Sequence, residues 1–257
     1  MLAIAERGYF LLCLALGWLL RSTRYSKARS VHPDGVRKQR LFYAPLLIWL
    51  GGPLVRILDA GIRVLPQREW EERERTVYRS VYGASIRIDA DRTMVLPYLK
   101  GRTLATLLED PTLGEPPRKE AIERATVALA EFHRLGFTHA DAMAENVMVD
   151  AGVARWFDFE TIHDSSRPLT WRCADDVRAL LTTCLLRTAT ENRAGTLQYI
   201  LDVYADEDIT RALSTSFTPV FRRSLTFHLA QAPLSYQSFR ETARLLSARV
   251  GSTARSS

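Results

Sequence analysis

The sequence has few cysteines and lysines, no glycine-rich loop before residue 69, and no apolar run long enough to cross a bilayer as a straight helix. Its three cysteines, Cys13, Cys173 and Cys184, lack the spacing of a zinc site and lie in apolar or helical surroundings. They therefore indicate neither a disulfide framework nor a metal centre. A reducing, cytoplasmic compartment fits this usage best.

Arginine carries nearly all of the positive charge, since only four of the 35 Lys and Arg residues are lysine. Arginine binds phosphate in a planar, two-pronged geometry, so the net charge of +6 suits a phosphorylated, nucleic-acid or anionic-lipid partner. A coding bias toward arginine explains the same composition. No recognition helix, aromatic platform or zinc module supports a nucleic-acid partner, and we expect none.

The first 57 residues differ from the rest of the chain. Residues 9–20 and 41–57 are apolar, and a basic stretch separates them: Arg21, Arg24, Lys27, Arg29, Arg37, Lys38 and Arg40. This pattern is typical of an interfacial anchor on the anionic cytoplasmic face of a membrane. The alternative is that the same residues pack as helices against the domain that follows.

Residues 58–250 have the composition and patterning of one folded α+β domain. A charged helix is predicted over 69–82, because Trp70, Val77 and Val81 form one apolar stripe. Two short strands are predicted over 84–89 and 93–96. Residues 97–101 then read as a hinge between a small first lobe and a second, helical lobe.

The second lobe is predicted to be mainly helical. One helix is expected over 118–134, where Gly136 stops it, and another over 177–186, preceded by Asp175 and Asp176. Two or three further helices are expected between about 196 and 250, and residues 251–257 read as a frayed tail.

Between these helices lies the segment that carries the candidate chemistry. His139, Asp141 and Asn146 stand in the array His-x-Asp-x-x-x-x-Asn, which is followed by strands predicted over 147–149 and 153–157. The second strand leads into Asp158, Phe159 and Glu160. A hairpin therefore separates a loop that contains one acid from a second acid.

Transfer of a phosphoryl group from ATP requires such residues. Catalysis of this reaction is mostly positioning and charge neutralisation by magnesium, which carboxylate and amide oxygens hold well. In this scheme Asp141 accepts or orients the attacking hydroxyl, while Asn146 and Asp158 hold magnesium. The candidate cofactors are therefore ATP and Mg²⁺.

The strings from His139 to Asn146 and from Trp156 to Glu160 resemble the catalytic loop and metal motif of the protein-kinase-like superfamily. Glu160 stands where eukaryotic protein kinases have glycine, and in this respect the chain is more similar to the bacterial lipopolysaccharide (Kdo) kinases and the small RIO-type kinases. The resemblance implies a two-lobed fold with a reduced N-terminal β lobe. It also places His139 and Asp141 in the catalytic loop.

Further roles follow from the resemblance alone. The segment that includes Pro97 and Leu99 is similar to the interlobe hinge whose backbone meets adenine, and residues 69–82 are similar to the regulatory helix of the small lobe. Asp175 and Asp176 resemble the acid that ties down the catalytic loop.

The sequence departs from the family in its small lobe. Neither Lys27 nor Lys38 lies in a convincing strand, so the lysine that usually binds the nucleotide phosphates is not evident. Arg63, in a short strand predicted over 61–65, is a candidate replacement, with Glu69 or Glu72 as its partner. The alternative is that Arg63 is an exposed strand residue.

Two functional hypotheses result. The first is an ATP- and magnesium-dependent phosphotransferase that acts on a hydroxyl group, at the cytoplasmic face of a membrane and near a lipid-linked or glycan acceptor. The second is a catalytically weak kinase-like protein that serves as a membrane-associated binding or regulatory module. The intact acids favour the first, and the missing lysine and glycine loop favour the second.

Overall fold

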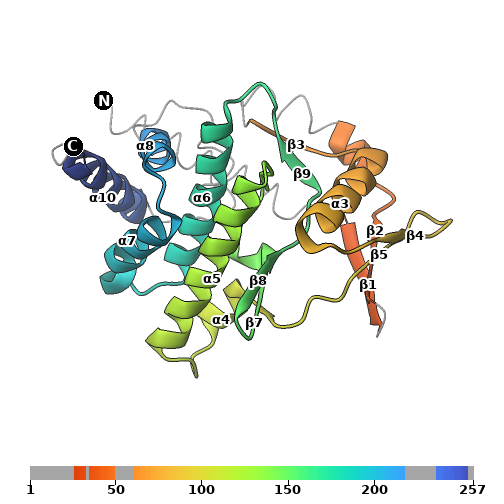
Figure 1. The fold of residues 1–257 in the computed structure, drawn as a ribbon, viewed down its shortest axis with the longest axis horizontal. Helices are drawn as coiled ribbons and strands as arrows, with labels where there is room; N and C mark the ends of the chain where they lie inside the picture. Colours follow the sequence, from red (N-terminus) through yellow and green to blue (C-terminus); the bar gives the residue numbers. More distant parts are fainter. Residues whose placement is uncertain (1–25, 33–34, 50–60, 218–235, 254–257) are drawn as a thin grey trace.

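The computed structural model describes residues 26–32, 35–49, 61–217 and 236–253. These residues form an α+β fold with several small sheets. Figure 1 shows β1, β2, β4, β5 and α3 at one end, and α5, α6, α7, α8 and α10 at the other, with the β7–β8 hairpin between them. Within the described ranges, no helix has the length and apolarity needed to span a membrane.

A four-stranded antiparallel sheet contains strands from two distant parts of the chain. Its order is β1-β2-β5-β4, with β1 at Ser26–His32, β2 at Gly35–Arg40, β5 at Met94–Leu96 and β4 at Arg87–Ile88. The expected division of the chain after residue 57 was therefore wrong for 26–40, because β2 pairs directly with β5. Its sequence, Gly-Val-Arg-Lys-Gln-Arg, has only one apolar residue, so it lacks the alternation that identifies strands.

Helix α3, Gln67–Tyr82, covers this sheet and matches the predicted helix closely. Trp70 and Val77 are fully buried and Val81 is partly buried, so the predicted apolar stripe is confirmed. Gly83 ends the helix in a left-handed conformation, which suits glycine because it has no Cβ.

A second sheet begins the helical part of the fold. It contains β6 at Arg102–Thr103, β7 at Val147–Asp150 and β8 at Val153–Trp156, and it confirms the predicted hairpin. Beside it lie α4, Leu104–Glu109, and α5, Glu115–Arg134. Helix α5 begins three residues before the predicted start. Its first turn contains prolines, which fit there because the N–H groups of a first turn have no acceptor within the helix.

The remaining elements complete the helical part. Strand β9, Thr161–His163, pairs with β3, Ile62–Val64, and the helices are α6, Leu169–Leu186, α7, Arg193–Tyr204, α8, Glu207–Ser216, and α10, Tyr236–Thr253. Single 3-10 turns lie at Ala144–Asn146 and Thr190–Asn192. Three helices therefore occupy the described part of 196–250, as expected. Helix α10 includes Gly251 and extends to Thr253, so the prediction of a frayed tail was wrong for 251–253, and 254–257 lie outside the described residues.

Glycine at position 101 lets the connector after β5 pass close to β7. Gly101 has φ +107°, and a Cβ there would lie 2.2 Å from the carbonyl oxygen of Val149. Gly152 has a similar φ of +97° but has no heavy atom within 4 Å of the same position. Substitution of Gly152 therefore tests backbone strain alone, whereas substitution of Gly101 adds steric overlap with β7.

We expect Gly101→Ala to lower the free energy of unfolding far more than Gly152→Ala. The second substitution should cost about 1–2 kcal/mol for the left-handed backbone alone, whereas the first must also displace β7. Urea unfolding of both variants measures the difference. Equal losses would mean that β7 yields freely to the added methyl group.

Candidate active site

The loop that contains His139 and Asp141 is held by a buried carboxylate of α6. Asp176 accepts hydrogen bonds from the backbone N–H of His139 at 2.6 Å and of Ala140 at 2.7 Å. Ala140 has φ +64°, an unfavourable conformation for a residue with a side chain, and the two bonds stabilise it. The expected role of the Asp175-Asp176 pair in tying down this loop is confirmed for Asp176.

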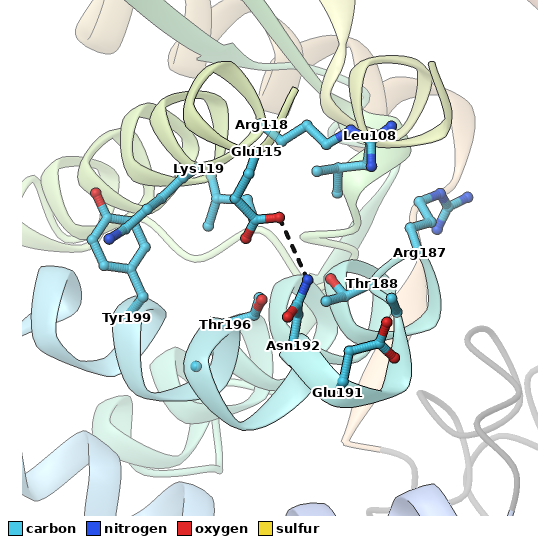
Figure 2. A pocket seen from close by; sticks show the side chains of 13 residues that line it. Leu108, Glu115, Arg118, Lys119, Arg187, Thr188, Glu191, Asn192, Thr196 and Tyr199 are labelled. Atoms are coloured by element: carbon cyan, nitrogen blue, oxygen red, sulfur yellow. Dashed lines mark hydrogen bonds between the residues drawn. The ribbon is translucent and has the colours of Figure 1, made fainter. Parts of the chain in front are cut away.

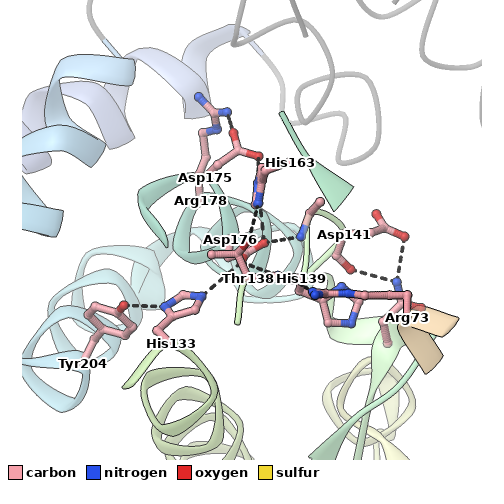
Figure 3. A network of polar contacts seen from close by, with 12 residues as sticks. Arg73, His133, Thr138, His139, Asp141, His163, Asp175, Asp176, Arg178 and Tyr204 are labelled. Carbon is pink, nitrogen blue, oxygen red and sulfur yellow. Dashed lines mark hydrogen bonds and ion pairs between the residues drawn. The ribbon is translucent and has the colours of Figure 1, made fainter. Parts of the chain in front are cut away.

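Further buried contacts surround Asp176 (Figure 3). His133 lies between the Tyr204 hydroxyl, at 2.6 Å from Nδ1, and Asp176 Oδ2, at 3.0 Å from Nε2. His133 is therefore buried between α5 and α7. His163 contacts Asp175 and Thr138, each at 3.0 Å.

Asp141 and Asn146 lie together, as the array predicted. Asn146 Nδ2 donates to the Asp141 carboxylate at 2.8 Å and to the Asp141 carbonyl at 2.9 Å. Both bonds use the amide nitrogen, so the amide oxygen remains as the ligand atom of Asn146. The Asn146 carbonyl also accepts from the Phe157 N–H at 3.0 Å, which fixes the loop beside the residue that precedes Asp158.

The unexpected member of the site is Lys38. Its ammonium group lies against Asp158 in a hydrogen-bonded ion pair and 3.8 Å from Glu74 Oε1. Glu74, on α3, also accepts from the Phe159 N–H at 3.2 Å and from the Trp70 indole at 3.1 Å. The view that Lys38 lies outside a strand was wrong: β2 presents it to α3 and to the Asp158 segment.

The charges of this cluster depend on one another. Burial alone would lower the pKa of Lys38, but the nearby carboxylates of Asp158, Glu74 and Glu160 outweigh that effect and raise it. Burial raises the pKa of Glu74 to about 7, although Lys38 opposes this shift. Lys38 is therefore firmly cationic, whereas Glu74 changes charge near neutrality.

A second cation and carboxylate lie beside the first pair. Arg40 and Glu160 are each two residues beyond Lys38 and Asp158, and Arg40 Nη1 lies 3.6 Å from Glu160 Oε2. The Trp70 ring lies below both cations, 4.4 Å from the Arg40 guanidinium carbon and 5.1 Å from the Lys38 nitrogen. Glu160 therefore helps to pair β2 with the segment that contains Asp158.

The other expected phosphate ligands lie elsewhere. Arg63 is on β3, where its half-exposed side chain pairs with Glu69 at 2.8 Å. Glu72 is exposed and pairs with Arg75 at 2.6 Å. Of the two partners expected for Arg63, Glu69 is therefore confirmed and Glu72 was wrong. The α3 carboxylate that lies near Lys38 is instead Glu74, on the buried face of the helix. The signal that could have identified Glu74 is its position four residues after the buried Trp70.

His139 is fully buried and cannot contact a substrate, so its expected catalytic role becomes a positioning role. Its Nε2 lies 3.0 Å from the Phe157 carbonyl, and its ring lies 4.9 Å from that of Phe159. Burial lowers its pKa to about 4, so the ring is neutral at neutral pH. It thereby joins the Asp141 loop to the Asp158 segment.

The connector at 97–101 joins the two parts of the fold. Pro97 and Leu99 are partly buried, and Tyr98 is exposed. Among the described residues, the backbone groups of 97–100 make no backbone–backbone hydrogen bond. Within the described ranges, no other backbone group occupies them.

The oxygen atoms of Asn146 and Asp158 suit magnesium better than a metal ion whose ligands must all come from the protein. Within the described ranges, no group of three or more His, Cys, Asp and Glu residues could hold a metal ion. Magnesium needs only one or two protein oxygen ligands when phosphates and water complete its octahedron. The Asn146 amide oxygen and the Asp158 carboxylate fit that limited role.

Two comparisons with known proteins give no assignment for this site. Neither the scan against protein-family models nor the search of curated proteins found a match. The chemistry must therefore be inferred from the geometry.

The buried histidines predict how stability depends on pH. Burial lowers the pKa of His163 to about 4 from the ordinary 6.5. Between these values the unfolded chain binds a proton that the folded chain does not, so stability is lost as pH falls from 6.5 to 4. We expect His163→Gln to reduce this loss by about 3 kcal/mol.

Urea unfolding of wild type and His163→Gln across this pH range measures the effect. His139 is present in both proteins, so its own contribution cancels. Parallel pH profiles for the two proteins would contradict the assignment of a neutral, buried His163.

Proposed function

We propose that this chain is an ATP- and magnesium-dependent phosphotransferase with a two-lobed protein-kinase-like fold, and that its acceptor is a hydroxyl group. The observation that carries the proposal is the convergence of Lys38, Glu74 and Asp158, from three separate elements, beside the Asp141–Asn146 loop. Phosphoryl transfer requires such a cation, a partner to orient it, and two metal ligands.

Each residue has a distinct task in this proposal. Asp141 accepts the proton of the attacking hydroxyl, and the two hydrogen bonds from Asn146 orient it. Asn146 and Asp158 would hold magnesium, and Lys38 would bind phosphate oxygens. Bound Mg-ATP would supply the phosphoryl group and the metal charge that neutralises it. The backbone groups of residues 97–100, which pair with no other backbone group among the described residues, suit the nucleotide base.

The acceptor in this proposal lies at the cytoplasmic face of a membrane and is lipid-linked or a glycan. The basic and apolar residues of the first 57 positions support this location. Residues 9–20 lie outside the described residues, so their part in membrane association stays a prediction.

A catalytically weak binding module is the less favoured function. It was suggested by the absence of both a lysine and a glycine-rich loop. The ion pairs of Lys38 remove the first reason. The second remains, since Gly35 is the only glycine near the turn between β1 and β2.

We expect the wild-type chain to bind and hydrolyse ATP only when magnesium is present. Asp158→Asn should lose Mg-ATP binding, because a metal ligand is lost. Asp141→Asn should retain binding and lose turnover by about 10²-fold or more, the usual range for a catalytic base. Calorimetry and phosphate release measure these effects. A wild type that does not bind Mg-ATP would refute the proposal and favour the binding module.

We expect Lys38→Met to weaken Mg-ATP binding by at least about tenfold, because a charge-assisted phosphate contact is lost. Arg63→Met is the matched control and should change the dissociation constant less than about twofold, since exposed ion pairs contribute little. Circular dichroism verifies that each variant is folded. A larger loss of Mg-ATP affinity in Arg63→Met than in Lys38→Met would instead favour Arg63 as the phosphate ligand.

A further inference from the structure

Three large apolar side chains are exposed together just after β2. Phe42 is 92% exposed, Leu46 is 57% exposed and Trp49 is 72% exposed. Leu46 and Trp49 lie three residues apart on helical residues 44–49 and therefore share one helix face, and Phe42 lies in the turn that leads into this helix. We call these three residues the aromatic surface.

The backbone beneath the aromatic surface is ordered by local contacts. Ala44 is fully buried, and its N–H donates to the Leu41 carbonyl at 3.0 Å. The Leu47 N–H donates to the Tyr43 carbonyl at 3.2 Å, and the Phe42 and Tyr43 rings lie edge to face at 5.2 Å. The turn is therefore structured, yet it directs its largest apolar groups away from the core.

The distribution of charge favours a lipid partner over a protein partner. Residues 1–103 contain 18 Lys and Arg against 9 Asp and Glu, whereas residues 104–257 contain 17 against 20. The aromatic surface thus lies in the strongly basic part of the chain. Exposed aromatic and aliphatic groups in a basic region fit the boundary between lipid headgroups and acyl chains, where tryptophan is favoured and anionic lipids attract cations.

We propose that the aromatic surface inserts into the headgroup region of an anionic lipid bilayer and docks the protein there. This inference deepens the proposed function and rests on it, because docking serves catalysis only if the chain acts on an acceptor at the membrane. Phe42 lies only four residues after Lys38, so their Cα atoms are at most about 14 Å apart. Docking would therefore hold the candidate site at the depth of the headgroups, within reach of a hydroxyl on a lipid-linked acceptor.

A cavity in the helical part of the fold is a weaker candidate for a binding site. Figure 2 shows a cavity of about 290 Å³ among α4, α5, α6 and α7, lined by Arg118, Lys119 and Tyr199 among others. Its Glu115 lies across the opening and contacts Asn192 at 3.5 Å. Three basic and two acidic side chains line this cavity, so its mixed charges select no single ligand class.

The test is co-sedimentation of the full chain with vesicles, without nucleotide. Vesicles of phosphatidylglycerol and phosphatidylcholine are compared with vesicles of phosphatidylcholine alone. The variant that replaces Phe42, Leu46 and Trp49 with serine should bind the anionic vesicles at least about tenfold more weakly than wild type. The matched control replaces Leu135, Val153 and Leu169, which are 56%, 46% and 46% exposed, and should bind as wild type does.

Three results would overturn the inference. Wild type could fail to bind anionic vesicles, or the triple variant could bind them as well as wild type does. The aromatic surface could instead join two copies of the chain, which sedimentation velocity would show as a dimer that the triple variant loses while its vesicle binding is unchanged. Because no nucleotide is present, none of these results depends on phosphotransfer, and ATP binding by the triple variant tests the proposed function separately.

Discussion

The buried carboxylate of Asp176 is the contact on which the arrangement of the site depends. It sits on the longest described run of buried helix, accepts two backbone N–H groups of the 139–140 segment, and contacts His133 as well. Its interactions with neighbouring histidines and its hydrogen bonds lower its pKa despite its burial. An ionised, immobile acid thus fixes a loop whose backbone would otherwise relax from the left-handed conformation of Ala140.

The candidate site is completed by contacts between elements that are distant in sequence. Lys38 comes from β2, an inner strand of the four-stranded sheet, Glu74 from α3 and Asp158 from the segment after the β7–β8 hairpin. Burying these charges is costly unless each has a partner. The packing of Trp70 below Lys38 and Arg40, and the additional pair of Arg40 and Glu160, provide such partners. These ion pairs therefore fix the position of the four-stranded sheet relative to the helical part.

The sequence predicted those parts of the molecule that have a local signal. The stripe of α3, the β7–β8 hairpin and the proximity of Asp141 to Asn146 follow from periodicity and spacing within a short segment. Strand β2 has no such signal, because its buried face carries Lys38 in place of an apolar residue. Glu74 was likewise missed, since one glutamate among several in α3 is distinguished only by what packs against it. Tertiary contacts decide both cases.

Two consecutive residues of α3 hold different parts of the site. Arg73 donates to the Thr138 carbonyl at 2.6 Å, at the start of the Asp141 loop, while Glu74 contacts Lys38 and the Phe159 N–H. A helix advances 1.5 Å and turns about 100° per residue, so sliding or rotating α3 by one position breaks both sets of contacts. Helix α3 therefore couples the two contacts. A movement of the helix that separates Glu74 from Lys38 also separates Arg73 from the Thr138 carbonyl.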